Sequence, residues 1–354
     1  PAVGTSITFL IFSGILLLLG LLYFLSRKTA KRTVAVSVIL YELCSVLGHS
    51  GSFAFWETGL TYEGESIYNY LQVKEDDRSV ILSTNVLFGV QSIKMKEDGL
   101  TGMYYDYALA APLMADAPGK ENTEILILGM GTGTYAHQCK KYFVNVSVEG
   151  VEIDQKITDL AGTYFDLPSD IPVTTYDGRA YLQTIDKKYD VIMVDAYQDI
   201  TIPFQMSSAE FFELVRGHLK EDGVMVVNMN MKSDGAGGIN VCLADTISSV
   251  FSNVYTVDVK GATNRELFAS ENENILTLLS ENRKQLSQEE LTAMMGQVED
   301  NLVAYESTGE LLTDDKAPVE VLGMRVIDEL IQYEIGYYKD IFRERGLEGL
   351  LQSI

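Results

Sequence analysis

The N-terminal end of the chain is its most apolar part. Ile7–Leu25 is a run of 19 residues without a charge. A helix of this length spans roughly 28 Å, close to the hydrocarbon thickness of a bilayer. The basic stretch RKTAKR follows the run, whereas a signal peptide carries its charges ahead of the apolar run. We therefore predict a transmembrane helix with a basic flank over residues 1–32.

A second apolar stretch, Thr33–Trp56, contains Glu42 and His49 and is rich in Gly and Ser near its end. Three interpretations stay open: a second span, an interfacial helix, or a buried helix of a soluble domain. We assign residues 33–62 to this segment and a linker. Because the chain starts beside the membrane with Pro1 rather than Met, we expect it to be part of a longer protein with further spans ahead.

The pattern then changes twice. Within residues 63–118, short β-rich runs (IYNYLQV, SVILSTN, VQSIKM) separated by polar turns predict a small antiparallel β domain. Within residues 119–284, strand and helix patterns alternate, which predicts an α/β domain with a mainly parallel sheet and helices on both faces. The expected strands are Ile125–Leu128, Val146–Ile153, Val173–Thr175, Tyr189–Val194, Val224–Asn228, Val254–Val257 and Ile275–Leu279. The expected helices are Thr134–Phe143, Gln155–Phe165, Ala180–Ile185, Ala209–Leu219 and Ile239–Val250.

The C-terminal part, residues 285–354, is an acidic extension with helical periodicity, interrupted by a loop at Thr313–Val319. The formal net charge of the whole chain is −23, although residues 1–32 carry four bases and no acid. Such a surface repels nucleic acids and attracts small cations, polyamines included; a generally soluble acidic surface explains it equally well. The three cysteines and three histidines are scattered, so we expect no disulfide and no metal site.

A glycine-rich turn follows the first strand of the α/β domain, in the sequence EILILGMGTGT. Gly129, Gly131 and Gly133 are spaced two apart, and glycine lets a backbone approach a ligand closely. A pyrophosphate-binding turn reads G-x-G-x-x-G, so this spacing favours an adenosyl-sulfonium ligand over a nicotinamide cofactor or a flavin.

Three acids follow three successive strands of this domain. Glu152 ends the second strand, where an acid can accept hydrogen bonds from both ribose hydroxyls. Asp177, followed by Gly178, can accept a hydrogen bond from an adenine amino group, although Asp-Gly is also a common turn pair. Asp195 follows the buried strand VIMVD and could instead be a helix cap. Since parallel strands end at one edge of a sheet, we predict that these acids form a nucleoside site.

These motifs resemble the spermidine and spermine synthases, which are aminopropyltransferases. The resemblance covers roughly Glu63–Glu281 and includes the small β domain, which ordinary methyltransferases lack. IPFQMSSAEFFELV, LKEDGVMVVNMN and LTDDKAPVE look like the membrane-fused branch of this family. The resemblance implies a Rossmann-like S-adenosylmethionine-dependent methyltransferase fold and either decarboxylated S-adenosylmethionine or S-adenosylmethionine as the co-substrate.

The family's site residues carry over by motif. Glu152 would bind the ribose and Asp177 the adenine, while Asp195 would hold the attacking amine and take its proton. The other implied nucleoside-binding residues are Gln91, Gly129, Gly131, Thr132, Gly133, Asp154 and Gly178. The family's catalytic tyrosine falls at Tyr104, with Tyr105 and Asp106 after it; packing in the core is an equal alternative for Tyr104 and Tyr105.

The sequence departs from the family where the amine binds. Thr132 replaces the aspartate of the family's G-G-G-D-G-G loop, and Gln198 replaces the second acid of its D-S-S-D-P motif. Asp199, Asp314 and Asp315 are the acids that could rebuild an amine site, although the last two also read as a solvated turn. No clear counterpart of the family's P-T-Y-P-S-G loop is found around Lys260–Arg265.

The leading interpretation is a membrane-anchored aminopropyltransferase that uses putrescine or another diamine and releases methylthioadenosine. Intact S-adenosylmethionine could instead be cleaved, cyclised or used for methyl transfer, and a non-catalytic nucleoside sensor is a third interpretation. The resemblance also implies a homodimer. We expect an integral membrane protein with a cytoplasmic catalytic domain, because nucleotide-type substrates are abundant there.

Overall fold

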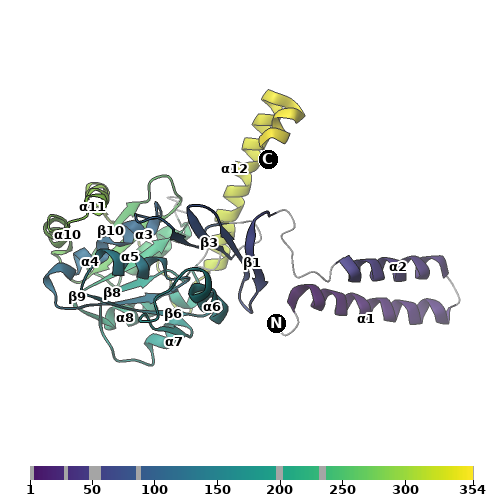
Figure 1. Ribbon diagram of the computed structural model, residues 1–354, viewed down its shortest axis with the longest axis horizontal. Coiled ribbons are helices and arrows are strands. Elements are labelled where there is room, and N and C mark those ends of the chain that lie inside the picture. The colour runs from purple at the N-terminus through teal and green to yellow at the C-terminus, as the bar shows by residue number, and fades with distance from the viewer. Residues whose placement is uncertain are drawn as a thin grey trace. The chain divides into compact units, whose positions relative to one another are not determined.

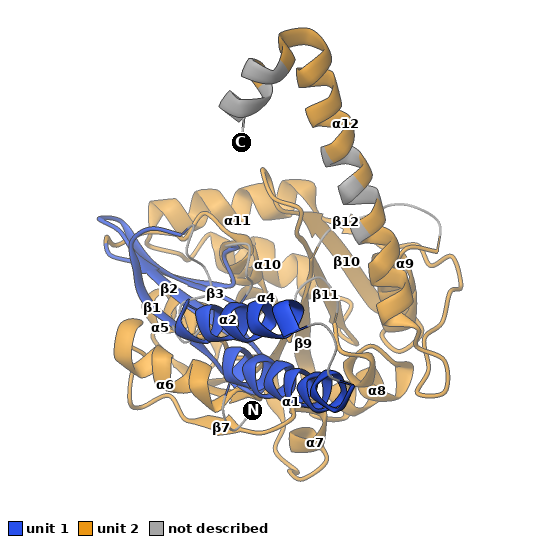
Figure 2. Cartoon of the chain, turned by 90° about the vertical axis from the view of Figure 1, so that its right-hand side faces the viewer, with its two compact units in different colours: residues 1–96 blue, residues 97–354 orange. Residues whose placement is uncertain are grey.

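The computed structural model describes residues 4–27, 31–47, 57–84, 89–196, 202–230 and 237–353. It divides into two compact units, residues 1–96 and residues 97–354 (Figure 2). The division therefore falls ahead of residue 118, where the sequence pattern places the end of the small β domain.

The first unit contains two helices, α1 (Gly4–Ser26) and α2 (Lys31–Leu47) (Figure 1). The Tyr41 hydroxyl on α2 donates a hydrogen bond to the Leu10 carbonyl on α1, at 3.0 Å. In the described part of the chain, α1 alone is long and apolar enough to cross a membrane, a test that a signal sequence also passes. No described side chain of α2 is buried, and the three interpretations of this stretch stay predictions. Residues 48–56 lie outside the described residues.

The first unit also contains the predicted antiparallel sheet, with four strands in the order β1-β2-β3-β4. The strands are β1 (Leu60–Glu65), β2 (Tyr70–Glu75), β3 (Ser79–Ser83) and β4 (Ser92–Met95). The sequence pattern identifies the last three, and β1 is an additional strand that pairs with β2.

The second unit is a Rossmann-like α/β domain around an eight-stranded sheet in the order β12-β10-β11-β9-β8-β5-β6-β7. Strands β9, β8, β5, β6 and β7 are parallel, whereas β11, β10 and β12 are antiparallel additions to one side. The strands are β5 (Thr123–Leu128), β6 (Val146–Glu152), β7 (Val173–Thr175), β8 (Tyr189–Val194), β9 (Leu219–Met229), β10 (Asn253–Asp258), β11 (Arg265–Ser270) and β12 (Val303–Ala304).

Helices cover both faces of this sheet, as the alternating pattern predicts. The first helices of the unit are α3 (Tyr104–Ala108), α4 (Ala110–Met114) and the short 3₁₀ helix η1 (Ala117–Gly119). Between and after the parallel strands come α5 (Thr134–Tyr142), α6 (Gln155–Tyr164), α7 (Gly178–Leu182), the 3₁₀ helix η2 (Phe204–Met206), α8 (Ala209–Gly217) and α9 (Ile239–Ser248). The chain ends with α10 (Ile275–Arg283), α11 (Glu289–Asn301) and α12 (Val319–Ser353).

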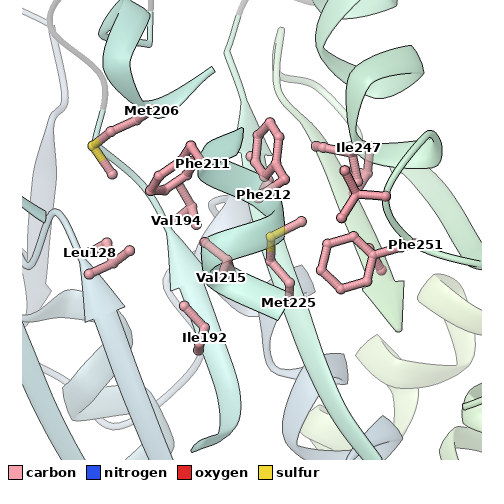
Figure 3. Close-up of a cluster of buried hydrophobic side chains, with 14 of the residues drawn as sticks. Leu128, Ile192, Val194, Met206, Phe211, Phe212, Val215, Met225, Ile247 and Phe251 are labelled. Atoms are coloured by element: carbon pink, nitrogen blue, oxygen red, sulfur yellow. The ribbon is translucent and has the colours of Figure 1, made fainter. Parts of the chain in front are cut away.

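A large core cluster lies between the sheet and helices α8 and α9 (Figure 3). Phe211 and Phe212 of α8 belong to this cluster together with Ile192 and Val194 of β8. Because side chains alternate along a strand, Val191 and Met193 face the opposite side of the sheet, where they are also fully buried. Because both faces of β8 are buried, the strand is held in place within the sheet. The backbone position of Asp195, which directly follows β8, is held with it.

Two elements differ from the pattern-based expectations. Ile275–Leu279, predicted as a strand, is the start of helix α10. Its buried residues Ile275, Leu279 and Asn282 recur at helical spacing, and a short apolar run alone does not distinguish the two structures. The strand in that region is β11. The hydrophobic pattern does not indicate this strand, because its first residues, Arg265 and Glu266, are charged.

The extension after residue 285 is mostly helical, with the short strand β12 within it, and its last helix packs against α9. Leu322 and Val326 at the start of α12 pack with Ile239 and Cys242 of α9. The Thr313–Val319 loop contains a small turn in which Thr313 and Lys316 pair through backbone hydrogen bonds. The backbone of α12 is kinked at Gly346.

Candidate active site

The parallel strands of the second unit end at one edge of the sheet, which we call the carboxyl edge. The glycine loop, residues 129–133, connects β5 to α5 at this edge. Gly129 has a φ of +88°, and a Cβ atom placed on it would lie 2.4 Å from the carbonyl oxygen of Asp195. Only glycine therefore lets the loop lie directly against the end of β8.

Glu152, at the end of β6, is fixed to the glycine loop. Its carboxylate accepts hydrogen bonds from the backbone N–H groups of Gly131 (2.9 Å) and Asp154 (3.0 Å). Burial raises the pKa of Glu152 to about 7, although both backbone donors act to lower it. The geometry thus presents a buried carboxyl group, with acceptor capacity beyond these two bonds, beside the loop.

Asp195, which follows β8, is held by two side chains. It accepts one hydrogen bond from the Tyr104 hydroxyl at 2.6 Å and another from the Asn228 amide at 2.9 Å. Burial raises the pKa of Asp195 to about 7, and the two donors lower it in part. A carboxyl group that titrates near neutrality is suited to accepting a proton at the working pH of a cell. Tyr104 itself is 5% exposed and stacks on Tyr105, with ring centroids 4.0 Å apart.

Asp177 lies one residue beyond Tyr176, whose backbone N–H donates to the carbonyl of Glu152 at 3.1 Å. Its carboxylate caps helix α7 through the backbone N–H of Ala180 (2.8 Å) and accepts a bond from the Gln205 amide (3.3 Å). The cap and a ligand contact are compatible, because a carboxylate has about four acceptor positions. Glu152, Asp177 and Asp195 thus all lie at the carboxyl edge around the glycine loop.

Two other predicted site residues, Asp154 and Asp314, form contacts within the protein itself. Asp154 caps helix α6 by accepting a bond from the Lys156 N–H, at 3.0 Å. Asp314 forms a two-bond ion pair with Arg179 and also accepts a bond from Ser208. This ion pair attaches the C-terminal extension to α7, so the carboxylate of Asp314 is already engaged. The binding roles of these aspartates stay predictions.

The remaining candidates fall in different parts of the molecule. Thr132 is 1% exposed within the loop, and Gly178 starts helix α7, where a Cβ atom would come within 3.2 Å of Met206. Asp315 is exposed. Gln198 and Asp199 lie outside the described residues, and Gln91 belongs to the first unit, so all three stay predictions. Among the residues that the structure describes, no three His, Cys, Asp or Glu side chains are grouped to hold a metal ion.

Sequence reasoning missed two residues next to Asp195. Asn228 is near the end of β9, where the motif LKEDGVMVVNMN marks a strand but not the direction of its side chains. Glu266 lies on β11, which the pattern did not identify. The strand register places Glu266 directly opposite Asn228, a relation that no short-range sequence signal encodes.

Residues 103–255 match the family model described as the spermine/spermidine synthase domain. A probable polyamine aminopropyl transferase from Bifidobacterium longum is 55% identical over 351 residues, which cover 94% of this chain and 78% of that protein.

Two solved structures show the same fold. A probable spermidine synthase from Corynebacterium glutamicum is 20% identical, with a TM-score of 0.51, over 63% of this chain and 86% of its own. A spermidine synthase in complex with the transition state analogue AdoDATO is 19% identical, with a TM-score of 0.54, over 67% of this chain and 84% of its own. The fold, the site and the relatives together lead to one assignment: this chain belongs to the spermidine/spermine synthase family of polyamine aminopropyltransferases.

Proposed function

We propose that this protein transfers the aminopropyl group of decarboxylated S-adenosylmethionine to a diamine such as putrescine and releases methylthioadenosine. One observation carries the proposal: Asp195 lies against Gly129 and is held by Tyr104 and Asn228, in a buried position that raises its pKa to about 7. The reaction needs a carboxylate of this kind beside the sulfonium.

The nucleoside half of the substrate fits the two other strand-end acids. Glu152 would accept hydrogen bonds from the ribose hydroxyls and Asp177 from the adenine amino group. The loop at Gly129–Gly133 would lie under the sulfonium, since its glycines leave the backbone uncovered. Carboxylates around a cationic sulfur compound also stabilise its charge.

The chemistry assigns Asp195 two tasks. The neutral amine nitrogen attacks the propyl carbon attached to sulfur, and the carbon–sulfur bond breaks with its electron pair going to sulfur. The nitrogen then loses a proton, which the Asp195 carboxylate accepts. Holding nitrogen and carbon near attack distance supplies much of the rate acceleration, and proton acceptance typically contributes a further 10²–10⁴-fold.

A second candidate keeps the same nucleoside site and uses intact S-adenosylmethionine. The observation that favours it is the buried Thr132, which stands where the family has an aspartate. A threonine hydroxyl can donate to the α-carboxylate of intact S-adenosylmethionine, whereas an aspartate would repel it. The reaction would then be cleavage, cyclisation or methyl transfer; a protein that binds the nucleoside without turnover would be a sensor.

Product analysis distinguishes these candidates. The purified full-length protein is incubated with each sulfonium compound, with and without putrescine, and the products are separated chromatographically. Methylthioadenosine and spermidine in equal amounts support aminopropyl transfer. Methylthioadenosine from intact S-adenosylmethionine without an amine supports cleavage, adenosylhomocysteine supports methyl transfer, and binding without any product supports a sensor.

We also propose that helix α1 anchors the enzyme in a membrane, with the catalytic unit in the cytoplasm. The support is the length of α1, its apolar composition and the basic residues that follow it. A homodimer is proposed on the family resemblance alone.

A further inference from the structure

Glu266, the second residue of β11, is an acid for which the proposed mechanism has no use. Its side chain is 0% exposed. Within the described residues, neither carboxyl oxygen of Glu266 has a hydrogen-bond partner. A buried polar group without a partner is costly and rare in native proteins. The position therefore calls for a donor or a cation that a ligand can supply.

The sheet places Glu266 in line with the reacting groups. It pairs directly with Asn228 across the antiparallel β11–β9 ladder, so the two side chains lie on the same face. The amide of Asn264, two residues before Glu266, donates to the Asn228 oxygen at 2.9 Å, and the Asn228 amide donates to Asp195 at 2.9 Å. Asp195, Asn228 and Glu266 therefore form a row across three adjacent strands at the carboxyl edge.

The charges along this row support a cationic ligand. Burial raises the pKa of Glu266 well above its usual value, and the charge of Asp195 raises it further. The two carboxyl groups thus interact electrostatically. A cation lying between them would relieve both the desolvation and the mutual repulsion.

We propose that Glu266 binds the distal ammonium group of the diamine whose other nitrogen is held by Asp195. This assignment rests on the proposed aminopropyl transfer. Residues on β8 and β11 are separated by two strand spacings, about 10 Å between backbones, a span comparable to the length of a short aliphatic diamine with an ammonium group at each end. Glu266 would replace the second acid of the family's D-S-S-D-P motif, where Gln198 stands in this chain.

The test is a comparison of two acceptors of equal carbon chain length, putrescine and n-butylamine. Each is titrated calorimetrically into the full-length protein saturated with methylthioadenosine. The wild type should bind putrescine about tenfold or more tightly than n-butylamine, because a charge-assisted hydrogen bond holds the second nitrogen. Glu266→Gln should abolish this preference and leave the affinity for methylthioadenosine unchanged, whereas the exposed control Glu273→Gln should preserve it.

A second variant keeps the charge and shortens its reach. Glu266→Asp should shift the preference from putrescine toward the five-carbon diamine 1,5-diaminopentane. A putrescine preference that survives in Glu266→Gln, or a wild type without any preference for the diamine, would overturn the assignment. Turnover is measured separately. If the wild type produces no methylthioadenosine, the proposed reaction is refuted. The comparison of putrescine and n-butylamine affinities would still test whether Glu266 binds the second ammonium group.

Discussion

At the residue scale, the site contains two carboxyl groups whose pKa values are both about 7 but whose attachments differ. Glu152 is fixed by two backbone N–H groups, one of which belongs to the glycine loop. Asp195 is held by the side chains of Tyr104 and Asn228, which can adjust as a proton arrives. This difference suits Glu152 to binding and Asp195 to proton transfer.

The raised pKa of Asp195 predicts how stability depends on pH. Since the native carboxyl binds its proton more tightly than the unfolded one, its contribution to stability is present at acidic pH and is lost as pH rises toward about 7. Asp195→Asn should therefore raise the Tm at pH 8 by about 2–4 °C, roughly 1 kcal/mol, with little change at pH 4. Differential scanning fluorimetry of the ligand-free protein measures this.

The exposed Asp186→Asn variant is the matched control and should show no such pH-dependent difference. A lower Tm for Asp195→Asn at pH 8 would mean that burial does not destabilise the charged form of Asp195.

Tyr104 is predicted to act through its hydroxyl, which lowers the pKa of Asp195 by donating to it. Tyr104→Phe keeps the ring that stacks on Tyr105 and removes the hydrogen bond. A lost bond to a charged group should reduce kcat/KM by about tenfold to a hundredfold at pH 7. The loss should be smaller at pH 9, where Asp195 is ionised without help; an equal loss at every pH would indicate a purely structural role.

Local sequence signals predict that Glu152 and Asp195 lie at the carboxyl edge, because parallel strands of one sheet end at the same edge, and the structure places both residues there. Asn228 and Glu266 were not predicted, since their place beside Asp195 depends on strand order and register. The ion pair between Asp314 and Arg179 likewise joins residues 135 positions apart.

At the element scale, the turn between β5 and α5 determines the geometry of the site. The carbonyl of Leu128 accepts a bond from the N–H of Asp195, and the carbonyl of Val151 accepts bonds from Gly129 and Met130. The turn is thus attached to both neighbouring strands, β8 and β6. Its conformation and the positions of the strand-end acids must change together.

Gly129→Ala should disrupt this arrangement. The new methyl group would meet the Asp195 carbonyl at 2.4 Å, in addition to the strain of a φ of +88°. We expect the free energy of unfolding to fall by about 1–3 kcal/mol, measured by thermal unfolding. Methylthioadenosine should bind more weakly, measured by calorimetry.

Gly309→Ala is the control, because Gly309 has a φ of +92° but no atom within 4 Å of the added Cβ. It isolates the backbone strain from the contact. Binding by Gly129→Ala as tight as that of Gly309→Ala would contradict the importance of the close approach.

The order of the elements could be predicted, because strand and helix patterns alternate with clear turn residues between them. Prediction failed where periodicity is ambiguous, as at Ile275–Leu279, or where charges begin a buried strand, as at Arg265–Ser270. In both places tertiary packing, rather than local preference, determines the structure.

At the scale of the whole molecule, an acidic chain with a basic, apolar N-terminal end suits an enzyme at a membrane that handles cationic substrates. Small cations are attracted to a surface of this sign, although the attraction is screened by salt. The family assignment explains the fold of the second unit. The role of helix α1 needs a separate test.

Membrane anchoring predicts how the protein fractionates. The full-length protein should remain in the membrane pellet after alkaline carbonate extraction and be released by detergent, because α1 is long enough to span the hydrocarbon core. Release of the intact protein by carbonate would show that α1 does not anchor it.

The most direct test of the account is the rate of methylthioadenosine release from decarboxylated S-adenosylmethionine and putrescine, in the wild type and in Asp195→Asn. The account predicts that the substitution lowers kcat by about 10²–10⁴-fold, while the calorimetric affinity for methylthioadenosine stays nearly unchanged. Turnover by Asp195→Asn at the wild-type rate would contradict the role of Asp195 and, with it, the proposed mechanism.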